Sequence, residues 1–132
     1  MRRRLLLLAP LLAFAAAPAL AGGKAEKKKG GGESFIQLPT MTATAVRPDG
    51  RRGVLTVEAG VDAPDPAVRA AAERAVPRLR DAYARVLQTY AAALRPGFAP
   101  DADRLSFELQ RATDQALGRK GARLLLGTVM VR

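Results

Sequence analysis

The sequence predicts an α+β domain in which a β-hairpin, a long proline-kinked helix, a second helix and a C-terminal strand follow one another, with the helices packed on one face of a small sheet. Three patterns predict this ββααβ order. Apolar and polar residues alternate over residues 53–62, as in a strand with one face in water. Apolar residues recur at three- and four-residue steps over residues 68–90, as on one face of a helix. Residues 123–131 (RLLLGTVMV) form a mainly apolar run that is typical of a buried strand.

The predicted hairpin occupies residues 35–62. Residues 35–47 are rich in Thr, Val and Ile and are expected to be extended, with Pro39 restricting where they can pair. Residues 48–50 (Pro-Asp-Gly) are a turn sequence. The alternation in the second strand directs one set of side chains to the core, namely Leu55, Val57, Ala59 and Val61.

The long helix is predicted to begin after Asp65, which is a suitable N-cap, with Pro66 at the first helical position. It is expected to end before residues 96–97 (Pro-Gly). Pro77 lies within it and is expected to kink the helix while its ring points away from the core. The predicted buried stripe consists of Val68, Ala72, Ala75, Leu79, Tyr83, Val86 and Tyr90.

The second helix is predicted to start near Asp101 or Asp103 and to end at Gly118. Its buried line is expected to comprise Leu105, Leu109, Ala112 and Ala116. The last strand, residues 123–131, is apolar on both faces, and such strands usually lie in the centre of a sheet. We therefore expect this strand to have a neighbour on each side.

Residues 1–21 have the arrangement of a secretory signal peptide. Three arginines follow Met1, residues 5–21 carry no charge, and the small residues Ala19 and Ala21 precede Gly22. This pattern predicts cleavage between Ala21 and Gly22. The competing interpretation is an uncleaved membrane anchor, because the run approaches the length that spans a bilayer. Both place the rest of the chain in the periplasm, either free or anchored in the inner membrane, since the arginines stay inside.

Residues 22–34 (GGKAEKKKGGGES) are predicted to be a flexible Gly/Lys linker before a single domain over residues 35–132. The linker lysines could contact anionic lipid headgroups, and the alternative is a solvated spacer. The whole chain carries 22 Lys and Arg against 12 Asp and Glu, a net charge of +10. Loss of Arg2, Arg3 and Arg4 on cleavage would lower it to +7.

The residue inventory excludes several classes of active site. The chain has no Cys and no His, and its two serines are Ser34 and Ser106. Cysteine nucleophiles, Cys/His zinc sites and His-based triads are therefore absent. The paired carboxylates Asp101 and Asp103 are better explained as helix caps than as calcium ligands, and turn and cap roles likewise account for Asp62 and Asp65. We expect a protein that is not an enzyme and has no cofactor or metal site.

A candidate partner-docking face lies on the long helix. At about 100° per residue, Arg74, Arg78 and Arg85 fall within roughly 40° of one another. They could meet a protein partner or an anionic polymer, and the competing interpretation is an ordinary solvated surface. Nucleic acid is not expected, because the chain has an export sequence and lacks a set of aromatic side chains for base stacking.

The order of the segments resembles the flagellar basal-body-associated FliL family. The residues that carry the resemblance are Phe35-Ile36-Gln37-Leu38-Pro39 in the first strand, LTVEAGV at residues 55–61, and Pro77-Arg78-Leu79-Arg80-Asp81 in the long helix. The resemblance covers residues 35–132. It implies a non-enzymatic inner-membrane protein with a stomatin-like α+β periplasmic domain that associates with the stator units of the flagellar motor.

Two functional hypotheses remain open. In the first, the chain is an accessory protein of the flagellar basal body that docks on a partner at the inner membrane, such as the stator, or on a second copy of itself. In the second, it is a free periplasmic adaptor or ligand-binding protein unrelated to motility. A retained anchor favours the first hypothesis, and a released mature chain favours the second.

Cell fractionation tests export. We expect the protein outside the cytoplasm, and N-terminal sequencing should find Gly22 as the first residue if the signal peptide is cleaved. A cytoplasmic protein that still begins at Met1 would contradict this prediction.

Overall fold

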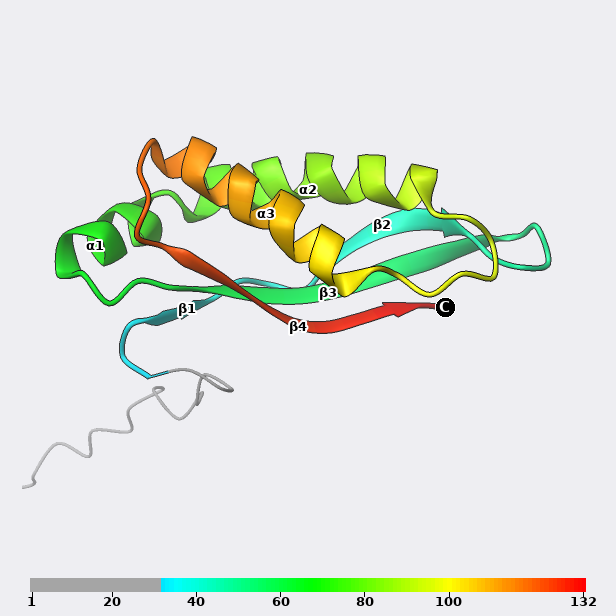
Figure 1. Ribbon diagram of the computed structural model, residues 1–132, viewed down its shortest axis with the longest axis horizontal. Helices are drawn as coiled ribbons and strands as arrows, with labels where there is room; N and C mark the ends of the chain where they lie inside the picture. The colour runs from blue at the N-terminus through cyan, green and yellow to red at the C-terminus, as the bar shows by residue number, and fades with distance from the viewer. Residues whose placement is uncertain (1–31) are drawn as a thin grey trace, which may run out of the picture.

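A computed structural model describes residues 32–132 and has an antiparallel four-stranded sheet covered on one face by three helices (Figure 1). The predicted α+β class and the ββααβ order are confirmed. The predicted signal peptide and most of the linker lie outside the described residues. The elements are β1 (Phe35–Gln37), β2 (Met41–Val46), β3 (Arg52–Asp62), α1 (Pro66–Arg74), α2 (Val76–Ala93), α3 (Ala102–Leu117) and β4 (Arg123–Val131).

Strand β3 is the centre of the sheet. Along one edge it pairs first with β2, where Ala43 lies opposite Leu55, and then with β1, where Ile36 lies opposite Val61. Along its other edge it pairs with β4. The predicted extended segment is therefore two short strands, with Pro39 in the gap between them. Proline cannot donate a ladder hydrogen bond, which explains the interruption.

The phenyl ring of Phe35 covers β3 at a glycine. A Cβ atom placed on Gly60 would lie only 2.1 Å from Cζ of Phe35. Any side chain at this position would displace the ring, and with it β1. Gly60 thus allows the short first strand to lie close against the central strand.

The predicted central position of residues 123–131 is wrong. Strand β4 pairs with β3 alone and forms one edge of the sheet. Because β1 and β2 share the opposite edge of β3, no further strand in residues 32–132 remains to flank β4. Its side chains on the helix side include buried Leu124, whereas Leu125 and Met130 on the outer face are half-buried.

The core lies between the sheet and the helices. The four β3 side chains predicted to face inward are all buried, which confirms the predicted alternation. Helix α2 contributes Leu79 and Tyr83, and α3 contributes Leu105 and Leu109; these four residues are completely inaccessible to solvent. Ala116, predicted in the same line of α3, is only half-buried.

The predicted kink at Pro77 takes the form of a break. Helix α1 ends at Arg74 and α2 begins at Val76, with Ala75 between them at φ −91° and ψ 1°. A proline cannot donate to the carbonyl four residues earlier, here that of Glu73, and its ring crowds that carbonyl. Pro77 consequently sits in the first turn of α2, and it is exposed as predicted.

The buried stripe of α2 also differs from the prediction at its end. Val86 and Tyr90 are only half-buried, and Leu87 and Ala91 occupy the fully buried positions. Leu87 and Ala91 continue the four-residue spacing that begins with Leu79 and Tyr83. This phase turns Tyr90 toward the side of α2 that faces α3.

A buried hydroxyl pair joins the two long helices. The side chains of Tyr83 in α2 and Thr113 in α3 hydrogen-bond to each other. Thr113 Oγ1 also donates to the carbonyl oxygen of Leu109 at 2.8 Å, so its only proton is used and Tyr83 is the donor to Thr113. Burial raises the pKa of Tyr83 to about 12 because it disfavours the charged phenolate.

Truncation of Leu79 should destabilise the domain strongly. Leu79→Ala removes a fully buried side chain and should lower the free energy of unfolding by about 2–5 kcal/mol. Arg78→Ala changes an exposed neighbour and should alter it by no more than about 0.5 kcal/mol. Urea denaturation followed by circular dichroism measures both values. Equal losses of stability in the two variants would contradict the orientation of α2, in which Leu79 is buried and Arg78 is exposed.

The Tyr83 hydroxyl should make stability fall at alkaline pH. An unfolded tyrosine loses its proton near pH 10, whereas the folded one keeps it to about pH 12. The unfolded state therefore binds fewer protons in this window, and stability is lost as the pH rises through it, by about 2–3 kcal/mol in total. Urea denaturation at pH 9, 10 and 11 should show a shallower decline for Tyr83→Phe. Identical pH dependence in both proteins would contradict this assignment.

Candidate functional site

The candidate site is a cleft of about 560 Å³ where the C-terminal part of α2 and the N-terminal part of α3 meet the loop of residues 94–101 that joins them. We call it the helix-end cleft. Its apolar lining comes mainly from Val86, Tyr90, Leu94 and Phe98. The side chain of Phe98 is 65% exposed, although aromatic side chains of this size are usually buried. The volume lies within the range of clefts that hold small ligands or side chains of a partner.

The loop that closes the cleft is shaped by local sequence. Leu94 leaves the helix in an extended conformation, and Pro96 cannot continue it. Gly97 has a φ of 83°, a left-handed conformation that favours glycine. Phe98 follows directly and is held outside the core by this turn. The sequence of the loop therefore accounts for an aromatic side chain at the surface.

Tyr90 ties the loop to the cleft floor. Its hydroxyl oxygen accepts a hydrogen bond from the backbone nitrogen of Asp101 at 2.6 Å and donates to the carbonyl oxygen of the same residue at 3.4 Å. The carboxylate of Asp101 caps α3 by accepting from the backbone nitrogen of Arg104 at 3.0 Å. These bonds fix the start of α3 relative to the end of α2.

The charged lining of the cleft is dominated by arginine. Three arginines, Arg85, Arg95 and Arg104, line the cleft together with two acidic residues, Asp101 and Glu108. Arg85 forms an exposed ion pair with Asp81 at 2.7 Å, and Glu108 lies 3.8 Å from Arg111. Within residues 32–132, neither Arg95 nor Arg104 makes an ion pair. Two guanidinium groups thus remain available beside an apolar surface.

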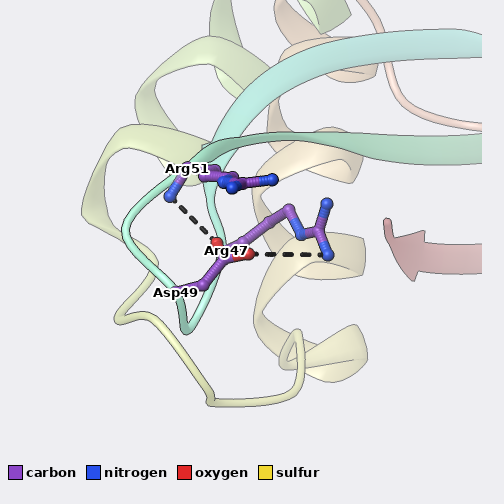
Figure 2. Close-up of polar contacts among 3 residues, drawn as sticks. All are labelled: Arg47, Asp49 and Arg51. Atoms are coloured by element: carbon purple, nitrogen blue, oxygen red, sulfur yellow. Dashed lines mark hydrogen bonds and ion pairs between the residues drawn. The ribbon is translucent and has the colours of Figure 1, made fainter.

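A basic hairpin turn adjoins the loop of the cleft. A Cβ atom on Gly97 would lie 3.9 Å from Cγ of Pro48, so the loop and the turn between β2 and β3 are neighbours. Figure 2 shows the carboxylate of Asp49 accepting from the backbone nitrogen of Arg51 at 3.0 Å and lying 3.8 Å from a guanidinium nitrogen of Arg47. Arg52, the first residue of β3, is also exposed, so it adds positive charge to this end of the molecule.

The three arginines of the predicted docking face are divided between elements. Arg74 is the last residue of α1, whereas Arg78 and Arg85 lie two turns apart on the same side of α2. The prediction that one continuous helix carries all three arginines is wrong, because the helix is interrupted at Ala75. Arg85 lines the helix-end cleft. The docking role of these residues stays a prediction.

Three of the four acidic residues singled out in the sequence have hydrogen-bond partners in the domain. Asp65 caps α1 by accepting from the backbone nitrogen of Ala67 at 2.8 Å, and Asp62 accepts a hydrogen bond from the hydroxyl of Ser34. Asp101 caps α3, and Asp103 lies in its first turn. Between residues 32 and 132, no three His, Cys, Asp or Glu side chains gather closely enough to hold a metal ion.

Sequence reasoning missed the cleft itself. It assigned Tyr90 to the core and gave no role to Arg95, Phe98 or Arg104. One sequence feature could have indicated the site: Phe98 follows a Pro-Gly turn and precedes a helix N-cap, where an aromatic residue is poorly placed to join the core. The arginines carry no such indication in an arginine-rich chain.

None of the helices described between residues 32 and 132 is both long and apolar enough to cross a bilayer. Comparison of the chain with protein-family models and with curated proteins finds no match in either.

Proposed function

We propose that this chain is an exported, non-enzymatic protein that docks an acidic segment of a protein partner in the helix-end cleft. The observation that carries the proposal is the combination of an exposed aromatic side chain, Phe98, with the guanidinium groups of Arg95 and Arg104, which form no ion pair within residues 32–132, at one concave site. Phenylalanine and arginine are both enriched at the centres of protein interfaces, and arginine is also among the residues that most often dominate the binding energy.

Charge supports a protein segment with acidic residues as the occupant. Arginine forms planar, bidentate hydrogen bonds with carboxylates, and the cleft offers two such groups beside an apolar floor. The chain's own linker is a poor occupant, because residues 22–34 contain four lysines against two glutamates. The partner is therefore expected to present carboxylates next to an apolar anchor side chain.

We propose the flagellar basal body as the setting. An N-terminal segment that is retained as an anchor would hold the domain at the inner membrane, and the segment order resembles flagellar accessory proteins that associate with the stator. In the alternative, the same cleft serves a free periplasmic adaptor unrelated to motility. The two differ in what loss of the gene does to swimming.

A complementation experiment tests both the cleft and the setting. Deletion of the gene should impair swimming under conditions that load the motor, and the parent gene should restore it. Arg95→Glu/Arg104→Glu should fail to restore it, because reversal of two charges should weaken partner binding at least about tenfold. A glutamate at position 104 suits the first turn of a helix, so folding should be retained.

The matched control is Arg119→Glu/Lys120→Glu, which makes the same charge change at exposed positions between α3 and β4. This variant should restore swimming fully. Equal behaviour of the two double variants would contradict docking in the cleft. Normal swimming of the deletion strain would contradict the flagellar setting and leave the free adaptor.

A further inference from the structure

Strand β4 has the composition of an interior strand and the position of an edge strand. Its residues are apolar on both faces, yet β3 is its single neighbour in residues 32–132. Most of its apolar side chains are only half-buried, namely Leu125, Leu126, Val129, Met130 and Val131. Edge strands of soluble proteins usually carry charges or prolines that discourage pairing. Residues 124–131 contain neither.

The first part of the β4 edge is closed by a side chain. Gln110 of α3 donates from Nε2 to the carbonyl oxygen of Ala122 at 2.9 Å and accepts at Oε1 from the backbone nitrogen of Leu124 at 2.8 Å. Its amide therefore replaces a neighbouring strand at this point. Another strand could not pair here without displacing it.

The second part of the edge is open. Val54 and Arg132 exchange both backbone hydrogen bonds, at 2.8 and 3.0 Å. Because backbone groups alternate in direction along a strand, Val129 and Val131 direct their N–H and C=O groups away from β3. No group among residues 32–132 hydrogen-bonds to them there. We call residues 126–131 the open edge. Strand β4 has one residue more than β3 between Leu126 and Val129, so the regular part of this edge is residues 129–131.

The other edge of the sheet differs. In β2, buried Met41, Ala43 and Ala45 alternate with exposed residues, two of which are Thr42 and Thr44. This is the pattern of a strand whose outer side faces water. Of the two longer strands that have an unpaired edge in residues 32–132, β2 and β4, only β4 carries mainly apolar side chains on both faces.

We propose that two copies of this chain pair antiparallel through their open edges, centred on Val129. The pairing joins two sheets into one and gives each β4 a second neighbour, which is the environment that its sequence fits. Two identical open edges can meet without charge repulsion, because residues 126–131 are uncharged although the whole chain carries +10. A second copy thus provides hydrogen-bond partners for the outward N–H and C=O groups of the open edge and covers apolar side chains beside it.

An exposed aromatic residue lies on the same side of the domain. Phe107 of α3 is 63% exposed and precedes Gln110 by three residues, so the two side chains project from the same side of the helix. Gln110 contacts the β4 edge. Phe107 therefore stands beside the edge where a second copy would approach, and pairing would cover it.

Proline substitution tests the proposal. In Val129→Pro, the lost N–H points away from β3, so the β3–β4 ladder should survive while pairing with a second copy is blocked. Thr44→Pro is the matched control, because Thr44 likewise directs its backbone groups to a free edge, that of β2. In sedimentation velocity of the full chain, the parent and Thr44→Pro should have twice the mass of Val129→Pro, with equal circular dichroism spectra.

A cysteine variant keeps the test informative if the proline unfolds the domain. Centring on Val129 places this residue opposite its counterpart in the second copy, with Cα atoms about 5.5 Å apart, within disulfide range. The chain has no cysteine of its own. Val129→Cys should therefore form a disulfide-linked dimer of twice the mass in the periplasm, and Thr44→Cys should not.

Three results would overturn the proposal. The first is a parent protein that stays monomeric at concentrations up to about 100 μM, because a dimer with a dissociation constant above this value is too weak to be specific. The second is a Val129→Pro variant that folds and is still a dimer, or a Val129→Cys variant that is a dimer but forms no disulfide. In either case the interface lies elsewhere. The third is a disulfide between Val129→Cys and a different protein, which would make a partner strand the occupant of the open edge.

Discussion

Burial of one face of β3 is the constraint on which the rest of the structure depends. This strand is the only element of residues 32–132 that pairs with all the other strands, and four alternating side chains on its inner face are buried. Helix α2 lies over β2 and α3 over β4, so each helix is positioned by a neighbour of β3 (Figure 1). A one-residue slip of β3 would turn Thr56 and Glu58 into the core, which fixes the register.

The features that the sequence predicts well are those set by local chemistry. The alternation over residues 53–62, the N-cap at Asp65 and the C-cap at Gly118 each depend on residues within a few positions of one another. The sequence predicts a kink at Pro77, because proline removes a hydrogen bond and crowds a carbonyl, but the structure has a break between two helices instead. Whether a proline kinks or breaks a helix depends on tertiary packing, and here Ala75 and Leu79 on either side of it are both buried in the core.

The features that the sequence does not predict depend on partners distant along the chain. The position of β4 depends on which edge of β3 the first two strands occupy, and nothing local to residues 123–131 encodes it. The helix-end cleft arises because α2 and α3 contact each other through Tyr83 and Thr113 while the loop of residues 94–101 closes their far ends. Composition could not distinguish the arginines of this cleft from those exposed elsewhere.

Helix α3 separates the two surfaces to which we assign binding. Glu108 lines the helix-end cleft, and Gln110, two residues later and therefore about 200° around the helix, closes part of the β4 edge. Occupation of one surface does not require groups from the other. A dimer joined at β4 would consequently carry two free clefts and could engage two acidic segments at once. Such bivalency raises apparent affinity without new contacts wherever the partner displays those segments in a repeated array.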